Sequence, residues 1–293
     1  MAAMRELPLP VLDALPLGAH RLMVLTDEAL AQACGVRIMY TDRSGGVSVG
    51  PFGELNLSPD INDDALAVER NIQIVREAAH AEKAGLVALE QVHGTRVVVA
   101  GALAESGGAV GGEPVVASVE DSAAIAGGHG RQQADGVVVG EADIAALLIS
   151  ADCPLLVVVS PSGRFAVAHA GWRGVVGGIA GKAVMCLARD DSCEPADFNA
   201  YLGPHICPDC FEVGEDVAQR FVDAFGPGSV LRERHVSLAH AISADLVRCG
   251  MSASRIRDAG LCTCCHPQRF FSYRATGGAC GRQGVFVVRM RET

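Results

Sequence analysis

The sequence predicts an α/β fold with mixed β-sheets, because strand-like apolar runs alternate with amphipathic helical segments along the chain. The tetrapeptide Ser160-Pro161-Ser162-Gly163 is a strong turn signal between two of these runs, so hairpins must occur beside the crossover connections. We find no internal repeat and no linker that cuts the chain. The 293 residues, 49% of them hydrophobic, are therefore expected to form a single domain over residues 1–293.

Strands are expected where apolar runs lie between turn signals, and helices where apolar residues recur every three or four positions. The expected strands are residues 36–41, 86–92, 96–100, 134–139, 145–159, 164–168, 200–203, 256–261, 270–274 and 285–289. The expected helices are residues 63–84, capped by Asn62 or Asp63, and residues 175–189, 213–225 and 238–249, the last opening at Ser237. Residues 101–133 are rich in Gly, Ala, Ser and Glu, and we expect a mobile surface insertion there.

The charge balance limits the kinds of partner that the chain can bind. The chain carries 24 basic and 34 acidic residues, a net charge of −10, which argues against nucleic acid or a membrane as the main partner. Its first residues include Glu6 and Asp13 and do not resemble a signal peptide, so a cytoplasmic location is expected. Reduced thiols are then the expectation for the 11 cysteines.

Three short segments each place one metal-ligand residue at the end of an apolar run. They are Gln91-Val92-His93-Gly94-Thr95, Ala151-Asp152-Cys153-Pro154 and Ala168-His169-Ala170-Gly171-Trp172-Arg173-Gly174. Two imidazoles and one thiolate can hold a transition metal and leave a fourth position open, as catalytic zinc sites do. If Pro161 and Ser162 are the central residues of the hairpin turn, Cys153 lies opposite Ala170, one position from His169.

Other interpretations of these residues remain open. Cys153 could be the nucleophile of a cysteine hydrolase without metal, with His169 as base and Asp152 or Asp135 as orienting group. Arg173 precedes the helix expected at residues 175–189 and could bind an anion there, or could pair with a structural carboxylate such as Asp152. The motif Cys207-Pro208-Asp209-Cys210 and the cluster Cys262-Thr263-Cys264-Cys265-His266 could form a second zinc site or a set of buried thiols.

The ordered motifs resemble a bacterial family long labelled multicopper polyphenol oxidase or laccase-domain proteins. Its members are now described as purine nucleoside phosphorylases, and some as peptidoglycan editing factors. Besides the three segments above, the matching motifs are Thr41-Asp42-Arg43-Ser44-Gly45-Gly46-Val47-Ser48, Leu55-Asn56-Leu57, Ala134-Asp135-Gly136, Gly203-Pro204-His205-Ile206, Phe211-Glu212-Val213 and Phe271-Ser272-Tyr273-Arg274.

The resemblance implies a three-layer α/β/α sandwich with mixed sheets, similar to cysteine hydrolases. It implies zinc, for which copper has also been claimed, on His93, Cys153 and His169. The implied reactions are phosphorolysis of adenosine, guanosine, inosine and methylthioadenosine, and adenosine deamination. Phosphorolysis also needs an anion site, for which Arg43, Arg173 and Arg274 are our candidates, and Asn56 is a further candidate for substrate binding. A non-enzymatic partner of cell-wall or division proteins is a further possibility.

True laccase chemistry requires several copper ions and many histidines. This chain has nine histidines, scattered singly and without a His-x-His pair. The sequence therefore disfavours a copper polyphenol oxidase, whatever the older family label. An open three-ligand zinc site, which can activate water near neutral pH, is consistent with deamination instead.

Overall fold

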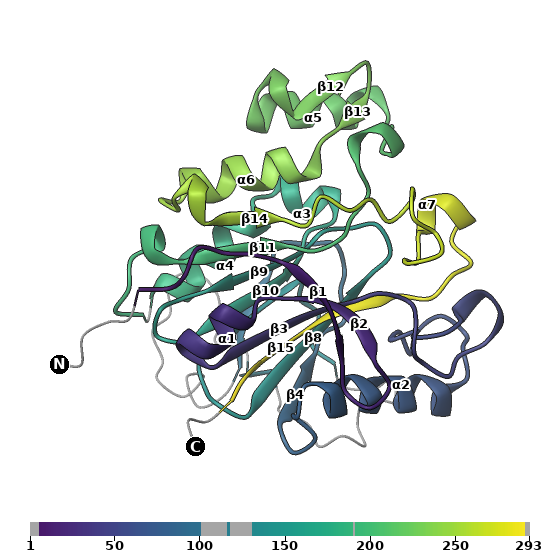
Figure 1. Ribbon diagram of the computed structural model, residues 1–293. Helices are drawn as coiled ribbons and strands as arrows, with labels where there is room; N and C mark the ends of the chain where they lie inside the picture. The colour runs from purple at the N-terminus through teal and green to yellow at the C-terminus, as the bar shows by residue number, and fades with distance from the viewer. Residues whose placement is uncertain (1–5, 101–115, 118–130, 190, 291–293) are drawn as a thin grey trace.

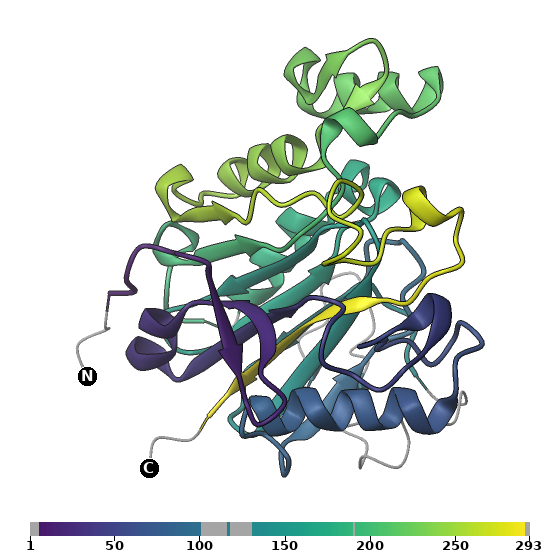
Figure 2. The ribbon, with the colours of Figure 1, turned by 45° about the vertical axis from the view of Figure 1, so that its right-hand side comes forward.

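The computed structural model describes residues 6–100, 116–117, 131–189 and 191–290. Two mixed β-sheets pack face to face, and helices cover the outer face of each (Figure 1). The expected α/β fold with mixed sheets is confirmed. It has four layers instead of the expected three, because two stacked sheets rather than one lie between the outer helices. The view in Figure 2 shows one sheet above the other, with α2 below the lower sheet.

The first sheet has six strands in the order β1-β2-β3-β15-β8-β4. Their bounds are β1 Asp13–Leu17, β2 Leu22–Thr26, β3 Val36–Thr41, β15 Gln283–Arg289, β8 Ile144–Ser150 and β4 Gly85–Ala88. The outer face packs against α2 (Ala65–Ala78), which buries Val68, Ile72 and Val75 on Met39 and Phe286. The helix α1 (Glu28–Cys34) connects β2 with β3.

The second sheet has seven strands in the order β14-β11-β9-β10-β7-β5-β6. Their bounds are β14 Ile256–Asp258, β11 Asn199–Leu202, β9 Leu155–Val159, β10 Phe165–His169, β7 Gly136–Val139, β5 Val97–Ala100 and β6 Val116–Ala117. The helices that follow β10 lie on its outer side (Figure 1); they are α3 Trp172–Val176, α4 Ile179–Arg189, α5 Glu215–Phe225 and α6 Leu238–Arg248. The remaining elements are the hairpin β12 Val230–Arg232 and β13 His235–Val236, the short helix α7 Tyr273–Thr276, and the 3-10 helices Gly50–Phe52, Pro195–Asp197, Pro208–Cys210, Pro227–Ser229 and Ala253–Arg255.

Alternation along the strands divides the core into layers. In β7, Val137 and Val139 point between the sheets, whereas Val138 points toward the helices of the outer layer. A buried hydrogen bond links the sheets through this apolar layer: the hydroxyl of Tyr40 in β3 donates to the carbonyl of Tyr201 in β11 at 2.8 Å. Stacked apolar faces supply most of the stabilisation, and such bonds fix how the sheets align.

Several expected elements have different boundaries in the structure. The run at residues 145–159 is not one strand, because the chain leaves the first sheet after β8, turns at Asp152 (φ 93°) and enters the second sheet as β9. The helix expected at 175–189 is interrupted at Gly177 and Gly178, where Gly178 has φ 78°. The strand expected at 270–274 is wrong, since Ser272 caps the helix α7 instead.

The cap of α2 also differs from the prediction. Asp64 accepts from the amides of Leu66 and Ala67 and is the N-cap, whereas Asp63 accepts from Ser48 and Asn56. The prediction of a mobile insertion lies mostly outside the described residues. Within residues 101–133, β6 pairs in parallel with Val99 and Ala100 and so adds a strand to the second sheet.

Candidate metal centre at one end of the sandwich

Two connections cross from the first sheet to the second at the same end of the molecule. The chain between β4 and β5 carries His93, and the chain between β8 and β9 carries Cys153. The two crossings are neighbours because β4 pairs in parallel with β8, Ala88 standing opposite Leu147. His169 ends β10 at this edge, with Leu155 of β9 as its partner. The fold therefore collects the three predicted residues from three separate strand ends.

The ligand atoms of His93, Cys153 and His169 all lie within 4.8 Å of one another. The two imidazole rings meet edge to face, with ring centroids 4.7 Å apart. His169 is buried, Cys153 is half-buried and His93 is exposed, so the group opens to solvent on the His93 side. The predicted proximity is thus confirmed, and metal ligation by these side chains stays a prediction.

The hairpin register differs by one residue from the expectation. Gly163 donates to the carbonyl of Ser160 at 2.9 Å, which makes Pro161 and Ser162 the central residues of a turn as predicted. Gly163 itself adopts φ 80° and adds a third loop residue, so Leu155 rather than Pro154 stands opposite His169. The ladder ends there, and the turn through Asp152 brings the Cys153 thiol to the imidazole.

A buried carboxylate organises two of the three segments. Asp135 Oδ1 lies 2.9 Å from His169 Nδ1, and its two oxygens accept from the amides of His93 at 2.9 Å and Gly94 at 2.6 Å. His93 has φ 59°, and this left-handed conformation lets consecutive amides converge on one carboxylate. By holding Nδ1, Asp135 leaves Nε2 of His169 free to act as ligand or base.

The first turn of α3 packs against both histidines without a side chain. A Cβ atom built on Gly171 would lie 2.6 Å from Cδ2 of His93 and 3.4 Å from Cε1 of His169. A Cβ on Gly174 would lie 2.8 Å from the carbonyl oxygen of Gly94. Both glycines are therefore needed for the close approach of this turn to the loop that carries His93.

The electrostatics of the group favour a thiolate. Burial raises the pKa of the Cys153 thiol, but the positive charge and N–H of His169, and then those of His93, lower that pKa to about 6. Burial likewise lowers the pKa of His169, while the Cys153 charge and the bond to Asp135 raise that pKa to about 9. Burial opposes ionisation of Asp135 as well, yet the His169 and backbone N–H bonds keep its pKa below the ordinary value.

A third crossing completes the wall beside Cys153. The chain that returns from the second sheet to β15 donates the hydroxyl of Thr263 to Asp152 Oδ1 at 2.6 Å and the amide of Arg274 to Asp152 Oδ2 at 2.7 Å. The amide of Ile206, after β11, donates to the Asp152 carbonyl at 2.9 Å. Asp152 therefore holds the turn that presents Cys153 and does not pair with Arg173. Gly171 and Thr263 lie in segments that we noted for other residues. Nothing in the local sequence indicates that Gly171 contacts the histidines or that Thr263 holds Asp152.

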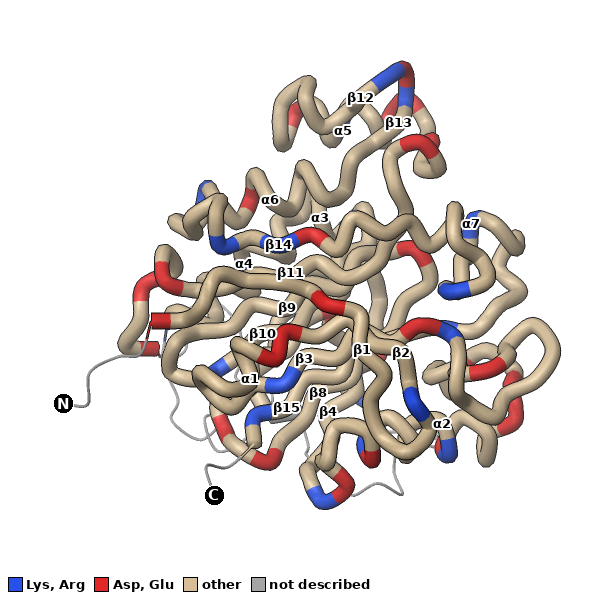
Figure 3. Tube along the Cα trace, in the orientation of Figure 1, with Lys and Arg blue, Asp and Glu red and all other residues tan. Residues whose placement is uncertain are grey.

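The arginine and asparagine side chains that were predicted to bind substrate or phosphate differ in their contacts. Arg43 donates to the carbonyls of Gly53 and Pro267, and buried Asn56 is fully engaged with Ser58, Asp63 and the amide of Arg282. Arg274 lies in α7, a region where Figure 3 shows basic positions, and its guanidinium donates to the carbonyls of Cys210 and Glu212. These three side chains hold loops.

Arg173 differs from them because it is exposed and stacks on the neighbouring Trp172 ring, 4.4 Å from its centroid. It follows Gly171 by two positions in the turn that touches both histidines. Its guanidinium therefore faces solvent, and its backbone belongs to the turn that packs against the two histidines.

The residues fit one transition metal better than a copper cluster. Two imidazoles and one thiolate suit zinc with an open position, and a single copper ion also accepts this donor set. Among the described residues, the other compact group of metal-ligand side chains contains four cysteines and no histidine. The donor sets in this part of the chain therefore do not match a multinuclear copper centre.

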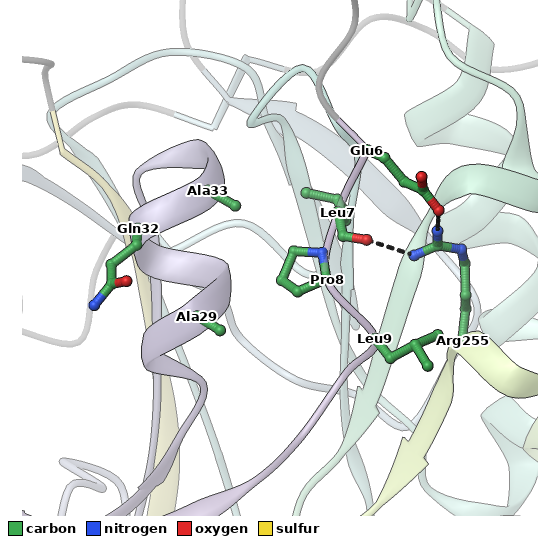
Figure 4. A pocket seen from close by; sticks show the side chains of 8 residues that line it. All are labelled: Glu6, Leu7, Pro8, Leu9, Ala29, Gln32, Ala33 and Arg255. Carbon is green, nitrogen blue, oxygen red and sulfur yellow. Dashed lines mark hydrogen bonds and ion pairs between the residues drawn. The ribbon is translucent and has the colours of Figure 1, made fainter.

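A hollow of about 560 Å³ lies away from this group, between the N-terminal segment, α1 and Arg255 (Figure 4). Arg255, one of its lining residues, donates to the Leu7 carbonyl at 3.1 Å and to Glu6 at 3.0 Å. It contains neither a histidine nor a cysteine, and we assign it no chemistry. In the ranges that the structure describes, no helix combines the length and apolarity needed to cross a bilayer.

Comparison with known proteins identifies the family of this chain. The sequence matches the model of a family described as multi-copper polyphenol oxidoreductase laccase over residues 37–290. It is 32% identical over 260 residues to purine nucleoside phosphorylase YlmD of Geobacillus stearothermophilus, covering 86% of this chain and 89% of that one. It is 31% identical over 263 residues to adenosine deaminase RL5 of an unknown prokaryotic organism, covering 87% and 94%.

The fold leads to the same group of proteins. The crystal structure of YlmD from Geobacillus stearothermophilus superposes with a TM-score of 0.78 at 29% identity, covering 95% of this chain and 100% of that one. The family match spans the strand ends that carry His93, Cys153 and His169. The chain is therefore an enzyme that belongs to the family described as multi-copper polyphenol oxidoreductase laccase, whose relatives include purine nucleoside phosphorylases.

Proposed function

We propose that this protein is a zinc-dependent purine nucleoside phosphorylase with adenosine deaminase activity. The observation that carries the proposal is the convergence of His93, Cys153 and His169 within 4.8 Å in a chain related to enzymes of both names. Adenosine, inosine, guanosine and methylthioadenosine are the proposed substrates, with phosphate as the second substrate. None of the 11 cysteines, all of which lie in the described ranges, forms a disulfide, which is consistent with a reducing cytoplasm.

The proposed ligands are His93, Cys153 and His169, with zinc as the metal and copper as the alternative. When bound, zinc supplies a Lewis acid that can activate water for attack on the purine ring. The residues of the chain prepare this site: Asp135 fixes the His169 ring, and the positive charge of His169 favours the Cys153 thiolate that a metal requires. His169 would release its Nε2 proton to solvent on becoming a ligand. Exposed His93 leaves the group open to a nucleoside from solvent.

Phosphorolysis needs an anion site as well. In this reaction a phosphate oxygen forms a bond to the ribose C1′ while the bond from C1′ to the purine nitrogen breaks, and the purine leaves after taking up a proton. We assign the phosphate to Arg173, since the guanidinium is exposed and its turn contacts both histidines. Arg43, Asn56 and Arg274 would act indirectly, through the loops that their side chains hold.

Turnover of adenosine tests the proposal. With phosphate, the purified protein should produce adenine and ribose 1-phosphate; without phosphate, it should produce inosine and ammonia. Cys153→Ala should abolish both reactions while thermal unfolding stays cooperative. Cys34→Ala is the matched control, since Cys34 lies in α1, outside the site. Full activity of Cys153→Ala would place the chemistry elsewhere.

One observation favours a second candidate, a cysteine hydrolase that uses no metal. The pKa values of about 6 for Cys153 and about 9 for His169 describe a thiolate paired with an imidazolium, and Asp135 orients that imidazole. An acyl substrate such as a peptidoglycan precursor would then be attacked by Cys153. Metal content separates the candidates, because such a pair needs no stoichiometric zinc. The comparisons above give no support to a cell-wall or division partner.

A further inference from the structure

Four cysteines outside the candidate active site lie together beside it. They come from two segments, Cys207-Pro208-Asp209-Cys210 after β11 and Cys262-Thr263-Cys264-Cys265 after β14. The sulfur atoms of Cys207, Cys210, Cys262 and Cys265 all lie within 4.8 Å of one another. All four thiols are free, and none of them is a member of the His93 group.

Each pair has the spacing that brings two thiols to one side of a tight turn. The 3-10 helix Pro208–Cys210 forms the turn of the first pair. In the second pair, the backbone amide of Cys265 donates to the sulfur of Cys262 at 3.4 Å. The amide of Cys207 donates to the same sulfur at 3.2 Å, across the two segments. Amides aimed at sulfur suit a thiolate better than a thiol, because a neutral thiol is a weak acceptor.

The spacing of the sulfur atoms is that of a metal tetrahedron. Zinc–sulfur bonds of about 2.3 Å place neighbouring sulfurs about 3.8 Å apart. Cys210 Sγ and Cys265 Sγ are 3.5 Å apart, and the largest separation in the group is within 4.8 Å. Four thiolates this close would repel one another unless a cation lay between them. Four protein ligands also close the coordination sphere, as structural zinc sites do.

We propose that Cys207, Cys210, Cys262 and Cys265 bind one zinc ion in a structural site, separate from the candidate catalytic group. The ion would join the segment after β11 to the segment after β14. These segments run side by side, with the amide of Thr263 donating to the His205 carbonyl at 3.1 Å. The site would add a metal link to this short stretch of backbone pairing.

The link would reach Cys153 through Asp152. One segment donates the Ile206 amide to the Asp152 carbonyl at 2.9 Å, and the other donates the Thr263 hydroxyl to its carboxylate at 2.6 Å. Both bonds come from residues next to the proposed ligands Cys207 and Cys262. Zinc in this site would therefore fix the turn that presents Cys153, so the four cysteines are positioning residues.

The proposal is tested by the zinc content of the full chain. Inductively coupled plasma mass spectrometry measures this content after purification without chelator. The decisive variant is Cys153→Ala, which disrupts the His93 group and keeps all four cysteines. It should retain one zinc per chain, whereas Cys153→Ala combined with Cys265→Ser should retain none. Cys34→Ser is the control and should match the unsubstituted chain, because the Cys34 thiol donates to the Leu30 carbonyl, which a serine hydroxyl can also do.

A second readout covers the case in which Cys265→Ser fails to fold. Cobalt loaded into the Cys153→Ala chain should give the intense sulfur-to-metal charge-transfer absorption of a tetrathiolate site. Absence of zinc and of this absorption in Cys153→Ala would overturn the proposal, as would an intact mass showing a disulfide between Cys210 and Cys265. Neither result depends on whether the His93 group binds metal, so the proposed function is tested separately.

Discussion

Asp135 Oδ1 lies 2.9 Å from Nδ1 of His169, and the same carboxylate accepts from the backbone amides of His93 and Gly94. One buried side chain thus fixes the ring of one proposed ligand and the backbone of another. Asp135→Asn should lower metal affinity roughly 10- to 100-fold, because an amide cannot receive all of these N–H groups and carries no charge. Competition with a chromogenic chelator measures the affinity.

A matched control for Asp135→Asn is Asp245→Asn. Asp245 is also a buried carboxylate that accepts from a backbone amide, that of Gly181 at 2.8 Å, but it lies in α6. Both variants should lose thermal stability, and Asp135→Asn alone should lose metal. Equal metal affinity in the two variants would show that Asp135 serves the fold only.

The thiol of Cys153 should react at unusually low pH in protein freed of metal by chelation. Its pKa of about 6 lies below that of an ordinary thiol, so alkylation by iodoacetamide should rise through pH 6. His169 stays protonated up to about pH 9, so the thiolate–imidazolium pair should exist between these two values.

Peptide mass spectrometry can follow Cys34 in the same experiment, since burial raises the pKa of that thiol and its alkylation should require higher pH. Zinc should suppress the reaction of Cys153 and leave that of Cys34 unchanged. Identical pH profiles for both cysteines would contradict the assigned electrostatics.

Gly171→Ala should impair the site more than the fold. The new Cβ would lie 2.6 Å from Cδ2 of His93, so that imidazole must move, whereas the backbone at Gly171 has φ −61° and accepts alanine. We expect at least a tenfold loss of adenosine turnover, with unfolding free energy lowered by about 1–3 kcal/mol, as for overpacked sites. Gly214→Ala is the control, because its Cβ would meet only the side chain of exposed Asp216.

Arg173→Lys should raise the apparent KM for phosphate, since a point charge cannot give the bidentate grip of a guanidinium. Deamination without phosphate should change little. Arg248→Lys supplies the control, as Arg248 also stacks on an aromatic ring, that of Phe225 at 5.6 Å, but belongs to α6. An equal loss of both activities in Arg173→Lys would instead assign Arg173 a structural role.

The candidate site was largely predictable because its residues end strands. His93, Cys153 and His169 each follow an apolar run, and a hairpin turn visible in the sequence joins two of those runs. The exact register was not predictable, because it depends on Gly163 adopting a positive φ and lengthening the loop. The sequence also did not show that the run at residues 145–159 changes sheets, since buried strands of both sheets have the same apolar composition.

The arginine and asparagine assignments depended on tertiary structure. An arginine side chain is long and can reach many acceptors. Arg274 donates to two loop carbonyls that are more than 60 positions away in the sequence. Asn56 lies in a recognisable motif, but its side chain forms hydrogen bonds with other residues of the protein, Ser58 and Asp63. The two pairs of cysteines were visible as spacings, whereas their meeting required the parallel pairing of β11 with β14.

The crossings that carry His93 and Cys153 have a consequence for substitutions far from the chemistry. Each crossing is anchored in one sheet and delivers its residue beside the other, so the separation of imidazole and sulfur depends on how far one sheet is shifted along its neighbour. Apolar faces resist separation strongly but sliding only weakly. The bond from Tyr40 to Tyr201 is a directional restraint on that shift. Sequence changes at such an interior contact can therefore tune the spacing of the metal ligands without touching them.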